Sequence, residues 1–370
     1  MAEMDMGIGQ NQSPKKKKKK KKKQSLLMSV ITGLIPWKGD SAGEIIRKVV
    51  FLCSLVLLVT AVVLLVGNAL SYVAPDNEMA VDENGNQLAT ESYIVELKNQ
   101  TPTKQQIENL PDGSINEEYA ALYEANNDFI GWVSINGTNI DYPVMQGDDN
   151  EYYLHHNFDK QDEFAGTIFT DYEGKFGPQE MPNNTILYGH NMLYKYKFSA
   201  LSNYRNNIDF FKFSPVIDFN TLYQKNKYKI FSVFLTNTHE EHGEVFNYTD
   251  FVYFENQSEF YNYVLECMDR SLYDTGIDIE YGDELLTLST CDASTGLSDM
   301  RLVIVARKVR ENESPDYNTD NITRKKSIKY CDAYYQAFGN KWKGRTWDID
   351  LVKGMREYLE ENGLMDEPQE

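Results

Sequence analysis

Three residues at the ends of apolar runs carry side chains suited to acyl transfer. Cys291 ends the run ELLTLSTC, and Arg301 opens the run RLVIVARKV ten residues later. His190 ends a third run, NTILYGH. A thiol acts as a nucleophile, an imidazole exchanges protons near neutral pH, and a guanidinium binds a carbonyl oxygen or an oxyanion. Together these groups would serve cysteine-dependent acyl transfer.

Alternation within ELLTLSTC indicates which way the thiol points. Leu286 and Leu288 share one face of a strand, while Thr287, Ser289 and Cys291 share the other. The thiol is therefore expected on a polar face at a strand end, followed by the small-residue loop DASTG. Such a thiol is accessible and can be activated. An unremarkable strand-end cysteine fits the same pattern.

The other cysteines have structural explanations. Cys53 lies in a long apolar segment, and Cys267 lies on an apolar helical stripe. Cys331 shares a helical face with Tyr334, Tyr335 and Phe338. A disulfide from Cys291 to Cys267 or Cys331 would leave an odd thiol.

His190 and Arg301 also have plainer interpretations. His190 fits an ordinary strand-end histidine, and Arg301 fits a surface charge paired with Asp292 or Asp299. Among the other histidines, His155 and His156 are expected on the surface or in hydrogen bonds. The pair in NTHEEHGE would make a weak metal site, but its spacing of three differs from the helical H-E-x-x-H arrangement.

Short β-branched and aromatic runs, broken by Gly, Asn, Asp and Pro, dominate the chain from residue 129. Eight of them predict strands of a closed β-barrel or sandwich: FIGWVSI, DYPVM, GTIFT, NTILYGH, VIDFN, KYKIFSVFLTN, ELLTLST and RLVIVARKV. Helices are predicted over 114–127, 195–213 and 258–273. The last has a core-facing stripe formed by Phe260, Tyr263, Val264, Cys267 and Met268.

Charge divides the chain sharply. The net charge is −19, yet residues 1–48 carry 12 Lys/Arg against 4 Asp/Glu, and the remainder carries 25 against 52. The acidic remainder argues against a nucleic-acid-binding domain. Residues 49–73 contain no charged side chain, which predicts a single membrane-spanning helix. A cleaved signal ending near Ala69–Leu70–Ser71 is the alternative.

The positive-inside bias keeps the basic N-terminus in the cytoplasm and the acidic bulk outside the cell membrane. Nine lysines at 15–23 suit anionic headgroups, with nucleic-acid binding as the other interpretation. The resulting domains are a basic cytoplasmic tail (1–48), a transmembrane helix (49–73), a stalk (74–114), a folded domain (115–310) and a C-terminal helical extension (311–370).

Taken together, TLSTC at 287–291, Arg301 and ILYGHNM at 186–192 resemble the signature of sortases, the membrane-anchored cysteine transpeptidases of Gram-positive bacteria. Ser289, Asp292 and the stretch GTIFTDYE at 166–173 are similar to class B. The resemblance covers about 115–310. It implies an eight-stranded sortase β-barrel with added helices, preceded by one transmembrane helix.

The resemblance also implies a reaction. Cys291 attacks the carbonyl of a threonine in a sorting motif, and a thioacyl enzyme forms. His190 protonates the departing amine, Arg301 steadies the carbonyl and oxyanion, and Ser289 and Thr290 line the substrate pocket. The implied partners are surface proteins with a C-terminal sorting signal and an amine of the cell wall or of a pilin. The chemistry requires no cofactor and no bound metal.

Two features depart from the class pattern: residues 311–370 and the lysine-rich leader. Two other functions also fit parts of the sequence. A cysteine peptidase would use the same Cys/His pair and end in hydrolysis. A non-catalytic surface scaffold would tolerate the loss of Cys291.

Overall fold

The computed structural model describes residues 34–72, 91–192, 196–339 and 341–365. The chain divides into two compact units, Met1–Ala74 and Pro75–Glu370. The lysine run at 15–23 lies outside the described residues.

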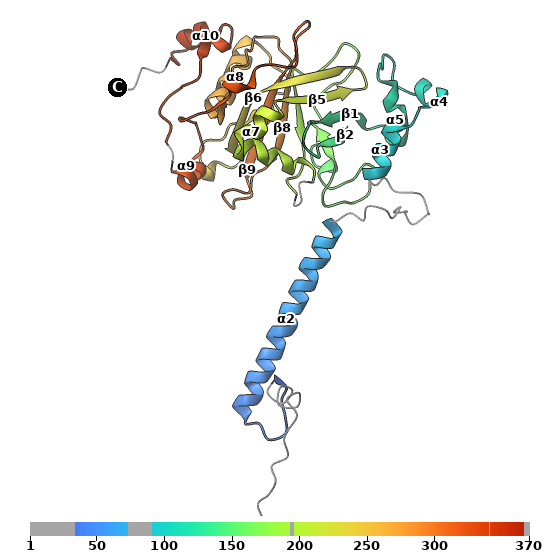
Figure 1. The fold of residues 1–370 in the computed structure, drawn as a ribbon, viewed down its shortest axis with the longest axis vertical. Helices are drawn as coiled ribbons and strands as arrows, with labels where there is room; N and C mark the ends of the chain where they lie inside the picture. Colours follow the sequence, from blue (N-terminus) through green and yellow to red (C-terminus); the bar gives the residue numbers. More distant parts are fainter. Residues whose placement is uncertain (1–33, 73–90, 193–195, 340, 366–370) are drawn as a thin grey trace, which may run out of the picture. The chain divides into compact units, whose positions relative to one another are not determined.

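The first unit is dominated by one helix, α2 (Ala42–Tyr72; Figure 1). Its part Ala42–Val63 is long and apolar enough to cross a membrane. The helix begins seven residues before the predicted apolar span because Ser41 and Glu44 form reciprocal N-terminal hydrogen bonds. The Ser41 amide donates to the Glu44 carboxylate at 3.1 Å, and the Glu44 amide donates to Ser41 Oγ at 3.4 Å.

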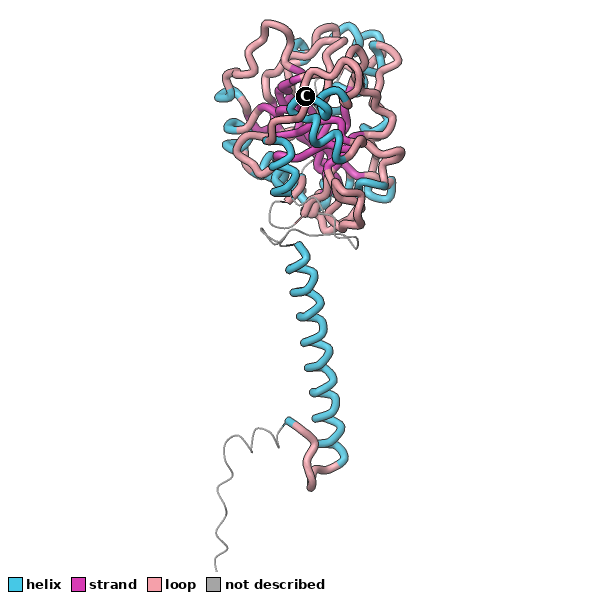
Figure 2. The backbone as a smooth tube through the Cα atoms, turned by 90° about the vertical axis from the view of Figure 1, so that its right-hand side faces the viewer, coloured by secondary structure: helices cyan, strands magenta, loops and turns pink. Residues whose placement is uncertain are grey.

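Eight strands of the second unit form a closed barrel, which confirms the predicted fold class. Around the barrel the order is β1-β2-β3-β4-β8-β9-β6-β5. Figure 2 shows the strands gathered at the centre of this unit, with helices and loops around them. The bounds are β1 Phe129–Ser134, β2 Asp141–Met145, β3 Ile168–Thr170, β4 Asn184–Tyr188, β5 Val216–Thr221, β6 Lys225–Asn237, β8 Leu285–Cys291 and β9 Met300–Lys308.

Apolar side chains pack on both faces of the central strands. In β9, Leu302 and Ile304 belong to one core cluster, whereas Val303 and Val305 belong to another. The second cluster includes the buried stripe of α8 (Gln257–Arg270), as predicted. A strand covered on both faces reads as a continuous apolar run, which explains the sequence LVIVA.

The predicted single helix over 195–213 is wrong. The chain instead forms a short 3-10 helix (Phe198–Leu201), then α6 (Ser202–Asn206) and α7 (Ile208–Phe213). The break occurs at Asn207, whose backbone is extended. Its side-chain oxygen accepts hydrogen bonds from the amides of Asp209 and Phe210 and so caps α7.

The other predicted helix, over 114–127, is shorter than expected: a 3-10 turn (Glu117–Tyr119) leads into α5 (Ala120–Ala125). Part of the predicted stalk is also helical, as α3 (Glu91–Asn99) and α4 (Lys104–Glu108). Ile94 and Leu97 of α3 are buried in a core cluster with Tyr119 and Phe129. Three-residue spacing places these two side chains on one helical face.

The C-terminal extension folds onto the barrel unit. Its strand β10 (Thr323–Arg324) pairs with β7 (Tyr273–Asp274), and two helices follow, α9 (Asp332–Phe338) and α10 (Met355–Glu361). Cys331 precedes α9 as its N-cap residue rather than lying within a helix. The start of the extension contributes Glu313 to an ionic network with residues of the barrel.

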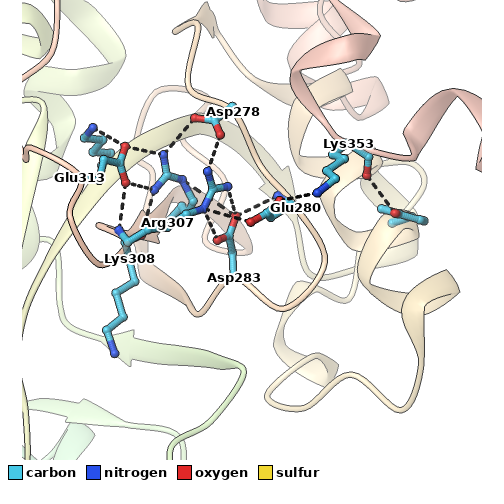
Figure 3. A network of polar contacts seen from close by, with 10 residues as sticks. Asp278, Glu280, Asp283, Arg307, Lys308, Glu313 and Lys353 are labelled. Atoms are coloured by element: carbon cyan, nitrogen blue, oxygen red, sulfur yellow. Dashed lines mark hydrogen bonds and ion pairs between the residues drawn. The ribbon is translucent and has the colours of Figure 1, made fainter.

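Figure 3 shows this network, in which Glu313 of the extension contacts Arg307 of β9. Glu313 accepts from Arg307 of β9 at 2.6 and 2.9 Å and from Lys229 of β6. Arg310 donates to both carboxylate oxygens of Asp283, at 2.8 and 2.7 Å. The side chain of Arg307 is completely buried, so its ion pairs with these carboxylates must offset the free-energy cost of removing the guanidinium charge from water.

Candidate active site

The ends of three strands meet at one edge of the barrel. β4 and β8 are parallel neighbours, with Tyr188 beside Ser289, and the Gly189 amide donates to the Ser289 carbonyl at 3.2 Å. β8 and β9 are antiparallel, and Cys291 pairs directly with Arg301. The segment that carries His190 therefore leaves the sheet beside the strand that carries the thiol.

A cleft of about 500 Å³ opens at this edge. All five residues predicted for the site line it: His190, Ser289, Thr290, Cys291 and Arg301. Four of them lie on β8 and β9, and His190 lies two residues after the end of β4, a strand far away in the chain that pairs with β8 in the barrel. The cleft is where a substrate could meet the thiol, the imidazole and the guanidinium together.

Cys291 differs from the other cysteines of this unit in its exposure. Its side chain is exposed, whereas Cys267 and Cys331 are buried, and all three thiols are free. Burial raises the pKa of Cys331, and it raises the pKa of Cys267 well above its ordinary value. The two buried thiols are therefore poor nucleophiles, and Cys291 is the reactive candidate of this unit.

His190 is partly buried and held by a backbone carbonyl. Its Nε2 lies 2.9 Å from the carbonyl oxygen of Leu154. Since a carbonyl can only accept, Nε2 carries hydrogen, and Nδ1 is the nitrogen that gains and loses a proton. Burial lowers the pKa of His190 below 6.5, although the bond to Leu154 opposes this shift. The ring of Phe164 stacks on the imidazole with centroids 6.2 Å apart.

Arg301 does not pair with the acids that a surface-charge interpretation would require. Its Nη1 donates to the carbonyls of Ser298 and Met300, each at 3.0 Å. Asp292 is instead bound by Arg205, and Asp299 accepts from His242 at 2.7 Å. Among the described residues Arg301 forms no ion pair with a carboxylate. Its Nε and Nη2 donors therefore suit a substrate oxygen.

Ser289 and Thr290 line the cleft, and their hydroxyls form hydrogen bonds with other residues that line it. Ser289 Oγ lies 2.7 Å from the hydroxyl of Tyr248, which is buried. Thr290 Oγ1 donates to the carbonyl of Gly189 at 2.7 Å. The second bond ties the nucleophile strand to the residue before His190. These two residues thus connect the elements that carry the reactive groups.

Close packing requires glycine before the histidine. A Cβ atom at Gly189 would lie 2.4 Å from Ile168 and 2.8 Å from Phe198. Beyond the histidine, Asn191 donates to the carbonyl of Cys291 at 2.7 Å. The sequence YGHN therefore serves two physical purposes here: it allows the backbone to pass through a tight space, and it bonds back to the nucleophile strand.

Several cleft residues were missed by sequence reasoning. Leu154 contributes through its backbone, and Tyr248 is the first residue of a 3-10 turn. Phe164, an exposed loop aromatic, does not line the cleft but stacks on His190. Also in the cleft lining, Tyr188 and Asn150 donate to one oxygen of Asp171, each at 2.8 Å. No spacing pattern in the sequence relates these residues to Cys291 or His190. Asp171 does lie in GTIFTDYE, the stretch that is similar to class B sortases.

Two of the remaining histidines, His156 and His242, form hydrogen bonds with neighbouring groups. His156 Nδ1 lies 2.7 Å from the Tyr152 carbonyl, which confirms the predicted hydrogen bonding. The His155 ring lies 6.4 Å from that of His190. No cluster of three metal-ligating side chains occurs in the part of the chain that the structure describes.

Comparison with known proteins shows which family the chain resembles. The family model described as "Sortase domain" matches residues 133–309. Sortase B of Listeria monocytogenes is 33% identical over 202 residues, which cover 54% of this chain and 76% of that protein. Sortase B of Staphylococcus aureus is 29% identical over 196 residues, covering 53% and 76%.

The chain is also similar to solved structures. The Staphylococcus aureus sortase B–substrate complex has 28% identity and a TM-score of 0.48, covering 53% of this chain and 87% of that chain. Clostridium perfringens sortase B has 33% identity and a TM-score of 0.45, covering 51% and 98%.

The chain belongs to the sortase family, and its relatives assign it to class B. It is accordingly a cysteine transpeptidase of the kind that attaches proteins to the cell wall.

Proposed function

We propose that this protein cleaves a sorting motif after threonine and transfers the threonine carbonyl to an amine. Cys291, as thiolate, attacks the carbonyl, and the amine fragment departs as a thioester forms. An incoming amine then attacks the thioester and regenerates the thiolate. Convergence of Cys291, His190 and Arg301 on one cleft is the observation that supports this proposal most strongly.

Proton transfer is assigned to His190. Its protonated imidazole gives a proton to the departing amine, and the neutral ring later takes one from the attacking amine. Anchoring of Nε2 by Leu154 supports Nδ1 as the exchanging nitrogen. The lowered pKa of His190 favours the neutral imidazole, which is the form needed for deacylation.

Oxyanion stabilisation is assigned to Arg301. Negative charge develops on the threonine oxygen as the tetrahedral intermediate forms, and a fixed guanidinium stabilises that charge more than the ground state. The two backbone carbonyls that hold Nη1 support a fixed orientation. The cross-strand position opposite Cys291 supports the required proximity.

The partners follow from the same chemistry. The acyl donor is a surface protein with a C-terminal sorting signal, and the acceptor is an amine of the cell wall or of a pilin. A thioester favours aminolysis over hydrolysis more than an oxygen ester does, which suits transfer outside the cell. The apolar part of α2 supports a single membrane anchor, with the N-terminus in the cytoplasm and the barrel outside.

Intact-mass spectrometry tests the proposal directly. The full chain in detergent is mixed with peptides of the Asn-Pro-x-Thr-Asn and Leu-Pro-x-Thr-Gly types and with a glycine-based amine. Cys291→Ala is the control. A peptide adduct on the wild type alone, converted by the amine into ligated product, is the expected result.

Two outcomes would contradict this function. An adduct that depends on Cys291 but releases only free acid at saturating amine would indicate a peptidase. If no peptide forms an adduct, and Cys291 reacts with iodoacetamide no faster than the buried Cys267, the catalytic assignment is wrong.

A further inference from the structure

The loop that follows the nucleophile is held by residues from outside the barrel strands. This loop, residues 292–299, connects β8 to β9 and carries one buried acid near each end. Asp292 and Asp299 are 3% and 4% exposed. A buried carboxylate is stable only when its oxygens accept hydrogen bonds or face a cation. The groups that bind these two carboxylates therefore fix the position of the loop.

Asp292 is bound from two directions. Arg205 of α6 forms an ion pair with one carboxylate oxygen. The other oxygen accepts from the hydroxyl of Tyr334 at 2.9 Å and from the Ser294 amide at 3.2 Å. Burial and the nearby Asp292 carboxylate raise the pKa of Tyr334, so its hydroxyl remains a donor.

Tyr334 lies in α9, beyond the residues 133–309 that match the sortase family. Its side chain is fully buried, in the core cluster that also contains Leu302 and Met300 of β9. The start of α9 also packs tightly on the barrel unit. A Cβ atom at Gly243 would lie 2.5 Å from the Asp332 amide nitrogen, and Gly243 has a φ of +118° that disfavours other residues.

The same loop orients the arginine of the site. Ser298 lies in it, and its carbonyl accepts from Arg301 Nη1 at 3.0 Å. At this end Asp299 accepts from His242, and its carbonyl accepts from the Thr238 amide. A displacement of the loop would therefore move the acceptor that fixes the guanidinium.

We propose that Tyr334 of the C-terminal extension is a positioning residue of the active site, which acts through Asp292 on the loop that orients Arg301. The extension is thus part of the catalytic unit. The inference rests on the proposed function for its effect on catalysis, whereas its effect on the loop is independent of that function.

Tyr334→Phe removes the hydroxyl and keeps the ring. The matched control is Tyr335→Phe in the same helix. The Tyr335 hydroxyl accepts from the Tyr330 amide at 3.0 Å and donates to the Ile328 carbonyl, so its bonds stay within the extension. Each variant loses the hydrogen bonds of one hydroxyl, and both should lower the melting temperature by a few degrees.

The experiment uses the full chain in detergent and two measurements. Hydrogen exchange followed by mass spectrometry reports on the amides of residues 292–299. Steady-state ligation gives kcat and KM separately. Tyr334→Phe should accelerate exchange in the loop and lower kcat, each about tenfold, as expected for the loss of a hydrogen bond to a charged group. KM should change little, and Tyr335→Phe should leave both loop exchange and kcat near wild type.

Other results would overturn the proposal. Unchanged exchange in Tyr334→Phe would show that the hydroxyl does not hold the loop. Faster exchange with unchanged kcat would show that the loop does not position the site. Equal losses in both variants would indicate general destabilisation. If the wild type forms no peptide adduct while exchange still responds to Tyr334→Phe alone, the proposed function fails but the connection from α9 to the loop is upheld.

Discussion

Cys291 and Arg301 face each other as a cross-strand pair at the open ends of β8 and β9. Directly opposed residues on antiparallel strands have Cβ atoms about 5 Å apart. Nη1 of the guanidinium donates to two backbone carbonyls, and no carboxylate among the described residues forms an ion pair with Arg301. This pairing places a fixed positive charge beside the thiol that would attack a carbonyl.

Replacing Arg301 by Ala should lower kcat/KM for ligation about 100-fold, the effect of removing one oxyanion donor. Lysine should rescue only part of the loss because its point charge cannot reproduce the planar fork. The control is Arg356→Ala, since Arg356 is exposed and pairs with Asp350 on the extension. Initial rates at several peptide concentrations provide the measurement. A loss below threefold in Arg301→Ala would remove this residue from the mechanism.

Exposing His190 should raise its pKa. Burial is the main cause of its lowered pKa, and Phe164 stacks on the ring while remaining 67% exposed itself. Phe164→Ala should let water reach the imidazole and move the pKa upward toward 6.5, so that protonation begins at higher pH. NMR titration measures this value, with His190→Gln to identify the signal. Phe213→Ala, at an exposed site outside the cleft, should leave the pKa unchanged.

Thr290→Val should impair catalysis more than stability. The substitution preserves shape but removes the hydroxyl that donates to the Gly189 carbonyl at 2.7 Å. Loss of this bond should loosen the segment that carries His190 and lower kcat by about tenfold. Rapid acylation kinetics with a sorting peptide would show the change. Wild-type acylation in a folded Thr290→Val protein would contradict a positioning role for this hydroxyl.

Acid should weaken the ionic network through Glu313. Its hydrogen bonds with Arg307 and Lys229 hold its pKa well below 4.5. A carboxyl group with a lower pKa in the folded state stabilises the fold above about pH 4.5, and this contribution declines as pH falls further. Glu313→Gln should therefore cost about 2 kcal/mol at pH 7, since breaking a buried pair strands the remaining charge. The difference from wild type should shrink in acid.

Urea unfolding between pH 7 and pH 3 measures this effect. Glu311→Gln is a suitable control because Glu311 is exposed and only two residues away. If the stability difference between wild type and Glu313→Gln stayed constant down to pH 3, the linkage argument would be wrong.

Local sequence patterns alone were sufficient to predict the barrel strands, the buried face of α8 and the accessible position of Cys291. Alternation within ELLTLSTC assigned Leu286 and Leu288 to the interior and Cys291 to an accessible strand end, because side chains alternate along a strand. The stripe on α8 and the apolar segment within α2 follow from helical periodicity and length in the same way. All eight barrel strands were predicted from their β-branched and aromatic runs.

Only the tertiary structure decided which residues meet. The Leu154 carbonyl at His190 and the Tyr334 hydroxyl at Asp292 come from segments with no sequence relation to their partners. The break at Asn207 depends on a local capping bond that competes with helical periodicity. A strand or helix follows from nearest neighbours in the chain, whereas hydrogen bonds between distant segments depend on how the barrel closes and how the extension packs upon it.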